Sequence, residues 1–215
     1  RFSNGLQTKR DYERQVNATA DGQHPIAVIL HCIDSRSPAE LLFDLGLGDI
    51  FSIRVAGNIS TEEVLGSMEF ATAVAGAKLV VVLGHTRCGA VGAAVHAACH
   101  PDEPVAPDCV HLASIVAPIS RSVDADLCAV PSTAPASRRQ SVADEVSRRN
   151  VAQVVHDIRR ESRVIERLIG EGHVGIIGMI YDVAAGEVKV VPGTAGGLPE
   201  AIVDKAIRKG IAAFA

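Results

Sequence analysis

The sequence contains no tryptophan, and aromatic residues make up only 3% of its 215 residues. Aromatic side chains form the stacking platforms for nucleic-acid bases and the belts at membrane interfaces, so the chain is poorly supplied for both contacts. An excess of positive charge is missing as well, because the formal net charge is −4. The chain lacks the basic surface that binds a nucleic-acid backbone, and we expect no nucleic-acid partner.

Long apolar runs and cysteines are also scarce. The run at residues 77–84 contains Lys78 and is far shorter than the roughly 20 residues that span a bilayer. Five cysteines are an odd and sparse set, which argues against a disulfide scaffold and favours thiols that are reduced or bound to metal. We expect no membrane span and a cytoplasmic location, as a free protein or as the cytosolic domain of a membrane protein, with a periplasmic location left open. Because the sequence begins at Arg1 without methionine or signal, we expect a mature form or part of a longer chain.

The sequence does contain apolar runs of strand length that alternate with helical patterns. The expected strands are Ile26–His31, Ile50–Val55, Leu79–Leu83, Val174–Ile180 and Glu187–Val191. The first four are continuously apolar, which is typical of buried parallel strands, whereas the last alternates and follows a turn. The expected helices are Thr61–Ala75, with Ser60 as N-cap, and a segment from about Gln140 to Gly170. This pattern predicts an α/β fold, a mainly parallel β-sheet with an antiparallel edge strand, flanked by helices.

One segment departs from this alternation. Residues 96–137 are rich in proline, alanine, aspartate and serine, and we interpret them as a partly helical excursion on the surface of a single domain that covers residues 1–215. His96, Cys99 and His100 have the i, i+3, i+4 spacing of one helix face and could bind a metal ion. A polar stripe at the start of the excursion is the favoured interpretation.

Three candidate metal ligands stand at the carboxyl ends of two expected strands. Cys32 follows the first strand, and His85 and Cys88 follow the third. Because the carboxyl ends of parallel strands meet at one edge of the sheet, the three side chains can come together. Two thiolates and an imidazole suit tetrahedral zinc, and three protein ligands leave the fourth position open, as in catalytic sites. Each residue alone is typical of a buried core, but together they predict a zinc site.

A charged pair lies beside Cys32. Arg36 can hold the carboxylate of Asp34 bidentately and keep it ionised. Asp34 can then orient a zinc-bound water or hydroxide, or it can occupy the fourth zinc position in a closed state. We favour the open form, in which Arg36 holds Asp34. Gly89 permits a tight turn and a close approach of the backbone to the metal.

The motifs Cys32-x-Asp34-x-Arg36 and His85-x-x-Cys88-Gly89 together resemble those of the β-class carbonic anhydrases. The similarity extends to Gly48-Asp49-x-Phe51, Arg54-x-Ala56-Gly57-Asn58, Ser67-x-Glu69 and Tyr181-Asp182-Val183. Phe70 stands where family members often have tyrosine.

This resemblance implies a zinc enzyme, a lyase that hydrates carbon dioxide reversibly to bicarbonate and a proton by attack of zinc-bound hydroxide. It implies zinc ligands at Cys32, His85 and Cys88, catalytic roles for Asp34 and Arg36, and a homodimer or higher homo-oligomer. We assign Gly57 and Gly89 to the substrate pocket. The proline-rich excursion is similar to that of a subgroup also found fused to sulfate-type membrane transporters, so the chain is also considered as a domain of a longer transporter.

There are three alternatives to the hydration of carbon dioxide. A thiol phosphatase needs a longer spacing than the four positions between Cys32 and Arg36, and it leaves His85 and Cys88 unexplained. A related hydrolase of carbon disulfide or carbonyl sulfide would use the same zinc site with a different pocket. A zinc-stabilised regulatory domain of a transporter would need a fourth permanent Cys or His ligand, and none is evident near the three candidates.

Overall fold

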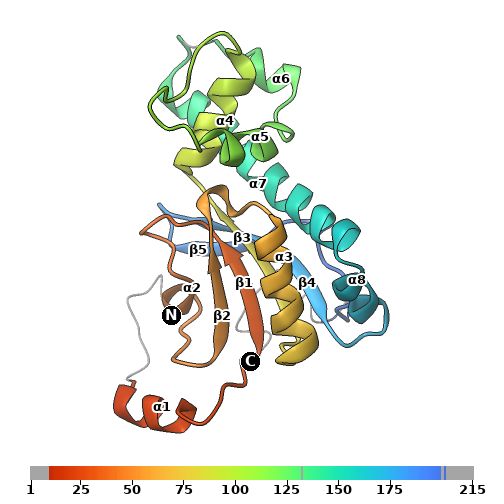
Figure 1. Ribbon diagram of the computed structural model, residues 1–215. Coiled ribbons are helices and arrows are strands. Elements are labelled where there is room, and N and C mark those ends of the chain that lie inside the picture. Colours follow the sequence, from red (N-terminus) through yellow and green to blue (C-terminus); the bar gives the residue numbers. More distant parts are fainter. Residues whose placement is uncertain (1–9, 132, 200, 202–215) are drawn as a thin grey trace.

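A five-stranded β-sheet lies at the centre of the computed structural model, which describes residues 10–131, 133–199 and 201 (Figure 1). The strands are β1 (Ala27–His31), β2 (Ile50–Arg54), β3 (Leu79–His85), β4 (Gly175–Asp182) and β5 (Glu187–Val190). Their order across the sheet is β2-β1-β3-β4-β5. The first four are parallel, and β5 runs antiparallel to β4 at the edge. The predicted α/β fold is confirmed.

The buried strands bring the chain to one edge of the sheet. Every residue of β1 and β3 is buried, as their continuous apolar runs predict. The register pairs His31, the last residue of β1, with Leu83 of β3. Cys32 and His85 therefore leave the sheet at the same edge.

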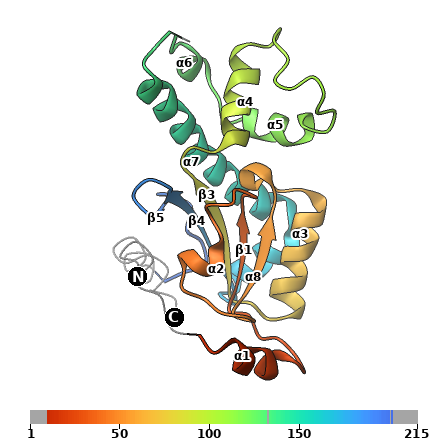
Figure 2. The ribbon, with the colours of Figure 1, turned by 90° about the vertical axis from the view of Figure 1, so that its left-hand side faces the viewer.

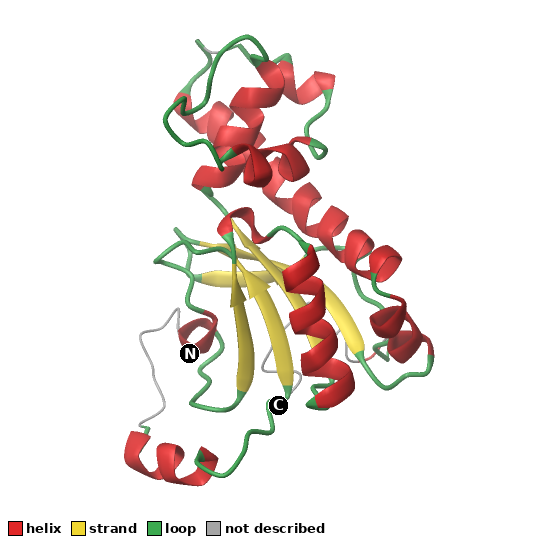
Figure 3. Cartoon of the chain, viewed as in Figure 1, coloured by secondary structure: helices red, strands yellow, loops and turns green. Residues whose placement is uncertain are grey.

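Helices cover the two faces of the sheet unequally. They are α1 (Tyr12–Thr19), α2 (Ala39–Leu42), α3 (Glu62–Glu69), α4 (Gly89–Cys99), α5 (Ala113–Ser120), α6 (Ala125–Cys128), α7 (Ala136–Glu161) and α8 (Arg163–Gly170). One face packs against α3, α7 and α8, and the other meets the short α2 and loops (Figures 2 and 3). Among the helices that the structure describes, none combines the length and the apolar character needed to cross a membrane.

Two helix boundaries correct the prediction. Thr61 rather than Ser60 is the N-cap of α3, because its Oγ1 accepts a hydrogen bond from the backbone N–H of Val64. The single helix expected over about 140–170 is two helices that break at Ser162, where the backbone is extended. The hydroxyl of Ser162 accepts from the backbone of Ile165 and donates to the carboxylate of Glu69 at 2.6 Å. The break therefore caps α8 and ties it to α3.

The proline-rich excursion is partly helical, as predicted, and lies beyond the carboxyl ends of the strands (Figure 1). There α4, α5 and α7 enclose an apolar group of buried residues, which we call the cysteine cluster. It consists of Cys32, Ile59, Cys88, Val91, Ala94, Val116, Ile119 and Val146. Because both candidate cysteine ligands belong to it, the excursion forms part of their surroundings and is more than a surface loop.

A disulfide bond joins Cys99, at the end of α4, to Cys128, at the end of α6. This corrects the expectation that all five cysteines are reduced or bound to metal, and it withdraws Cys99 from the metal-binding face considered with His96 and His100. Cys109 is free and exposed. The two bonded cysteines are 29 residues apart, so their pairing depends on how two helices meet and has no local signal in the sequence.

The disulfide generates a prediction about stability. Replacing Cys99 and Cys128 together with serine opens a loop with a sequence separation of 29. Loop-closure entropy predicts a loss of about 3–4 kcal/mol in the free energy of unfolding, measured by urea denaturation without reductant. Cys109→Ser, which removes an exposed free thiol, is the control and should leave that free energy unchanged. A double variant as stable as the wild type would contradict the prediction.

Candidate metal centre

Cys32, His85 and Cys88 converge at the carboxyl edge of the sheet. Cys32 follows β1, His85 ends β3, and Cys88 is the N-cap of α4. Their ligand atoms all lie within 4.8 Å of one another, and the two sulfur atoms are 4.0 Å apart. Tetrahedral zinc with Zn–S bonds of about 2.3 Å holds two sulfurs about 3.8 Å apart, so the spacing of the donor atoms fits that ion.

The imidazole of His85 is buried and prepared to coordinate through Nε2. Its Nδ1 donates a hydrogen bond to the carbonyl oxygen of Thr86 at 2.9 Å, which fixes the proton on Nδ1 and leaves a lone pair on Nε2. Nε2 has no hydrogen-bond partner among the described residues. A buried polar atom without a partner is rare, and a cation between His85 and the sulfurs would satisfy it.

The two thiols influence each other strongly. The neighbouring sulfur of Cys88 lowers the pKa of the Cys32 thiol to about 4, and the same contact raises the pKa of Cys88. The contact therefore favours a thiolate at Cys32, and a bound dication would also remove the proton of Cys88. The backbone N–H of Gly57 donates to the Cys32 sulfur at 3.4 Å and adds to the stabilisation of that thiolate.

Asp34 and Arg36 form a bidentate ion pair beside these ligands. Nε and Nη2 of Arg36 donate to the two carboxylate oxygens of Asp34 at 3.0 and 2.8 Å, and these bonds lower the pKa of Asp34 to about 2. Oδ2 of Asp34 also lies 3.9 Å from Nε2 of His85. Arg54 steadies the same loop, because it donates to the carbonyl oxygens of Cys32 and Asp34 at 3.2 and 2.7 Å. An ionised carboxylate, held by Arg36, thus borders the ligand positions.

Gly57 brings the backbone close to the Cys32 sulfur. Its φ of 67° is left-handed, and a Cβ at this position would lie 2.4 Å from Cδ1 of Ile119. Only glycine meets both conditions without strain. At Gly89, the first residue of α4, a Cβ would meet no atom of the described residues within 4 Å. The assignment of both glycines to the substrate pocket stays a prediction.

Two contacts from α7 were not predicted. Nδ2 of Asn150 donates to the carbonyl oxygen of Gly57 at 2.9 Å, and Oδ1 of Asp144 accepts from the backbone N–H of Arg87 at 2.8 Å. The partners are 93 and 57 residues apart in the sequence. No local motif reports such contacts, because they depend on how α7 lies across the loops.

Three other histidines, His31, His96 and His100, lie outside this group of ligands. Nε2 of His31 is 2.8 Å from the hydroxyl of Ser52, and burial lowers the pKa of His31 to about 4, so the imidazole is neutral and acts in packing. His96 and His100 stack on each other in the excursion, with ring centroids 4.8 Å apart. Neither joins the group of Cys32, His85 and Cys88.

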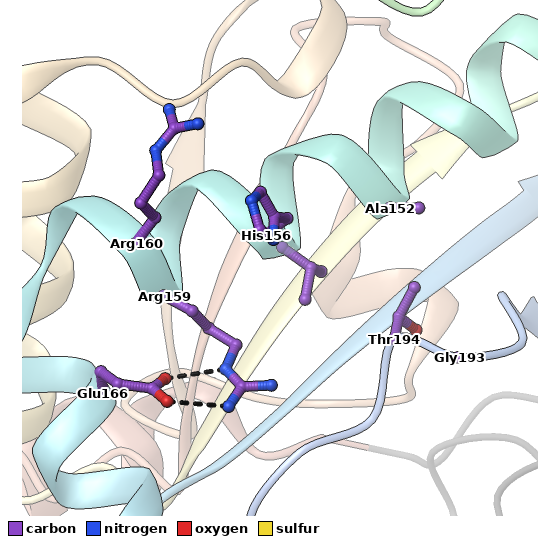
Figure 4. Close-up of a pocket in the computed structure, with 8 residues that line it drawn as sticks. Ala152, His156, Arg159, Arg160, Glu166, Gly193 and Thr194 are labelled. Atoms are coloured by element: carbon purple, nitrogen blue, oxygen red, sulfur yellow. Dashed lines mark hydrogen bonds and ion pairs between the residues drawn. The ribbon is translucent and has the colours of Figure 1, made fainter.

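A hollow of about 390 Å³ lies between α7 and the loop at residues 193–194, and none of the candidate ligands lines it (Figure 4). Arg159 and Glu166 face each other there, with Nε and Nη2 of the guanidinium 2.7 and 2.8 Å from the carboxylate oxygens. Glu166 thus already occupies the fork of Arg159 in this hollow.

Comparison with known proteins places these residues in context. A family model described as carbonic anhydrase matches residues 27–188. Carbonic anhydrase 2 of Mycobacterium tuberculosis is 37% identical over 169 residues, which cover 78% of this chain and 74% of that protein. The carbonic anhydrase of Mycolicibacterium smegmatis is 36% identical over 185 residues, which cover 86% and 83%.

Solved structures agree in fold. One of the tetrameric β-carbonic anhydrases of Sordaria macrospora superposes with a TM-score of 0.69 at 20% identity, covering 84% of this chain and 90% of that one. A β-carbonic anhydrase of Aspergillus fumigatus gives a TM-score of 0.71 at 23% identity, covering 94% and 88%. At these identities the similarity concerns the fold alone.

The left-handed glycine beside Cys32 generates a prediction. Gly57→Ala forces a Cβ against Ile119 and into an unfavourable φ, so we expect the free energy of unfolding to fall by about 2–4 kcal/mol in chemical denaturation. Gly66→Ala is the matched control, because Gly66 lies inside α3 with open space around it and should gain about 0.5–1 kcal/mol. Equal stability of the two variants would contradict the steric argument.

Proposed function

The chain belongs to the β-class carbonic anhydrase family, and we propose that it hydrates carbon dioxide reversibly to bicarbonate and a proton with zinc held by Cys32, His85 and Cys88. The observation that carries this assignment is the convergence of the three ligand atoms within 4.8 Å. Zinc at this position would lower the pKa of a water molecule to about 7 and supply a nucleophile at neutral pH.

Asp34 would orient the nucleophile. Its carboxylate stays ionised at physiological pH, since the bonds from Arg36 lower its pKa to about 2, and an ionised carboxylate can only accept hydrogen bonds. Oδ2 lies 3.9 Å from Nε2 of His85, so the carboxylate borders the residues that would hold the metal. By accepting a hydrogen bond from the attacking oxygen, Asp34 would turn a lone pair of that oxygen toward the carbon of CO2.

Arg36 would act through Asp34. Its fork takes both carboxylate oxygens, which would favour a state in which Asp34 does not bind the metal. Asp34 as a fourth ligand in a closed state would have to give up at least part of this bidentate pairing. This cost supports the open form as the working state of the enzyme.

The surroundings of the ligands favour a small apolar substrate. Cys32 and Cys88 belong to the cysteine cluster, whose other members are all apolar, and CO2 carries no net charge. The relatives and solved structures named above are all carbonic anhydrases, which favours CO2 over carbon disulfide or carbonyl sulfide. A purely structural zinc site has less support, because no fourth Cys or His joins the group among the described residues.

The disulfide bond indicates the type of cellular compartment in which the chain is found. The expected cytoplasmic location depended on reduced thiols, whereas a disulfide between Cys99 and Cys128 is typical of proteins in oxidising compartments. This supports a periplasmic or other extracytoplasmic location for the chain. Attachment to a transporter stays a prediction from the resemblance.

The open edge of the sheet supports a homo-oligomer. β2 is an edge strand of the described sheet, so one side of its backbone has no strand partner there. Phe51 of β2 packs edge-to-face on Phe70, which is 52% exposed, at a centroid distance of 6.4 Å. Val74, at the other end of the same short helical segment, is 72% exposed. An apolar face next to an open strand edge suits a second copy of the chain.

The ion pair generates a prediction about catalysis. Arg36→Ala and Asp34→Ala should keep stoichiometric zinc but lose about 100-fold or more of CO2 hydration, because the nucleophile is no longer oriented. Cys88→Ala should lose zinc as well. Stopped-flow hydration and metal analysis on the same samples separate these outcomes. Arg148→Ala is the matched control, because the side chain of Arg148 is 46% exposed and that of Arg36 is 50% exposed. A near-normal rate of CO2 hydration by Arg36→Ala would contradict the proposed role of the pair.

The apolar face beside β2 generates a prediction about assembly. Phe70→Asp combined with Val74→Asp places two charges on that face, and we expect sedimentation velocity to show a smaller species than the wild-type oligomer. Val110→Asp is the control, since Val110 is 78% exposed and lies in the excursion. A wild-type sedimentation coefficient for the double variant would exclude this face from the contact.

A further inference from the structure

Helix α7 touches two of the loops that carry the proposed ligands. It has 26 residues and runs from the excursion down along the sheet (Figure 1). We propose that Asn150 and Asp144 on this helix are positioning residues of the metal centre. Asn150 fixes the backbone of Gly57 beside the Cys32 sulfur, and Asp144 fixes the turn between His85 and Cys88. The inference rests on the proposed zinc site and goes beyond its ligands and ion pair.

Asn150 controls the direction of a hydrogen bond to the Cys32 sulfur. Its side chain is buried, and its Nδ2 holds the carbonyl oxygen of Gly57 at 2.9 Å. The N–H of the same glycine donates to the sulfur at 3.4 Å. Both groups belong to one residue with a left-handed backbone, so fixing the carbonyl also restricts the N–H. The N–H in turn holds the sulfur in one position, so Asn150 orients Cys32 for a cation shared with His85 and Cys88.

Asp144 controls the spacing of the other two ligands. Arg87 lies between His85 and Cys88 and has a φ of 57°, a left-handed conformation that a residue with a side chain adopts only when its surroundings stabilise it. Oδ1 of Asp144 accepts the Arg87 backbone N–H at 2.8 Å and is itself held by Nε2 of Gln140 at 2.9 Å. The carboxylate thus stabilises the turn that brings His85 and Cys88 to one point.

Packing alone does not require these contacts. Apolar residues of α7, such as Val146, Val151 and Val154, already attach the helix to the buried clusters. Asn150 and Asp144 instead direct polar groups at backbone atoms of the ligand loops. A positioning role predicts a change in metal affinity, whereas a merely structural role predicts a change in stability alone.

The experiment measures zinc affinity by competition with a chromophoric chelator, using metal-free wild-type protein and variants. Asn150→Asp keeps the size of the side chain but loses the donor, and Asp144→Ala loses the acceptor. We expect both to bind zinc about 10–100-fold more weakly than the wild type, as for other residues that orient metal ligands. Absorption of the cobalt-substituted proteins should change in the thiolate-to-metal charge-transfer region for Asn150→Asp.

Two controls separate positioning from folding. Asp144→Asn keeps Oδ1 as an acceptor for Arg87 and should restore wild-type affinity. Ser147→Ala changes an equally buried polar residue of α7, whose hydroxyl donates to the carbonyl oxygen of Ala143 in the same helix, and it should leave affinity unchanged. Unfolding of the metal-free proteins is followed in parallel, so that affinity is compared on folded protein.

The outcomes distinguish this inference from the proposed function. Weaker zinc binding by Asn150→Asp and Asp144→Ala, with rescue by Asp144→Asn, supports it. Wild-type affinity and cobalt spectra in folded Asn150→Asp and Asp144→Ala would overturn it while leaving the zinc site intact. A wild-type chain that binds no zinc would overturn the proposed function itself.

Discussion

Two sulfur atoms and one imidazole nitrogen, each with a lone pair to donate, lie within 4.8 Å of one another among buried residues. Burial removes the water that would otherwise form hydrogen bonds with such atoms, and Nε2 of His85 has no hydrogen-bond partner among the described residues to replace it. The arrangement becomes favourable when a cation joins the three donors, so metal binding and the local fold are coupled. The surrounding structure fixes these atoms from several directions: parallel strands deliver the chain to one edge, a left-handed glycine approaches a sulfur, and a long helix holds the loops.

Sequence patterns predicted the features that depend on short-range order. Continuous apolar runs marked the strands, and because parallel strands end together, residues directly after two of them could be expected to meet. Cys32, His85 and Cys88 are brought together for this reason. Asp34 and Arg36 are two residues apart in one loop, and this spacing likewise indicated that their side chains could form an ion pair.

Features that depend on long-range packing were missed or misplaced. The cysteine bond between α4 and α6 and the contacts of Asn150 and Asp144 join residues that only the folded chain brings together. The helix break at Ser162 was hidden because apolar periodicity continues on both sides, and the deciding hydrogen bond goes to Glu69 on α3. In each case tertiary structure, rather than local preference, determines the outcome.

The disulfide also determines how the chain responds to cleavage. Cys99 and Cys128 close a ring that contains α5 and most of the proline-rich segment, where exposed loops are the natural targets of proteases. Cys88 precedes this ring, whereas α7 follows it. A single cut inside the ring therefore leaves the two fragments covalently joined, with the ligands on one fragment still tethered to the helix on the other. The nicked molecule would migrate as one chain on a non-reducing gel and as two after reduction.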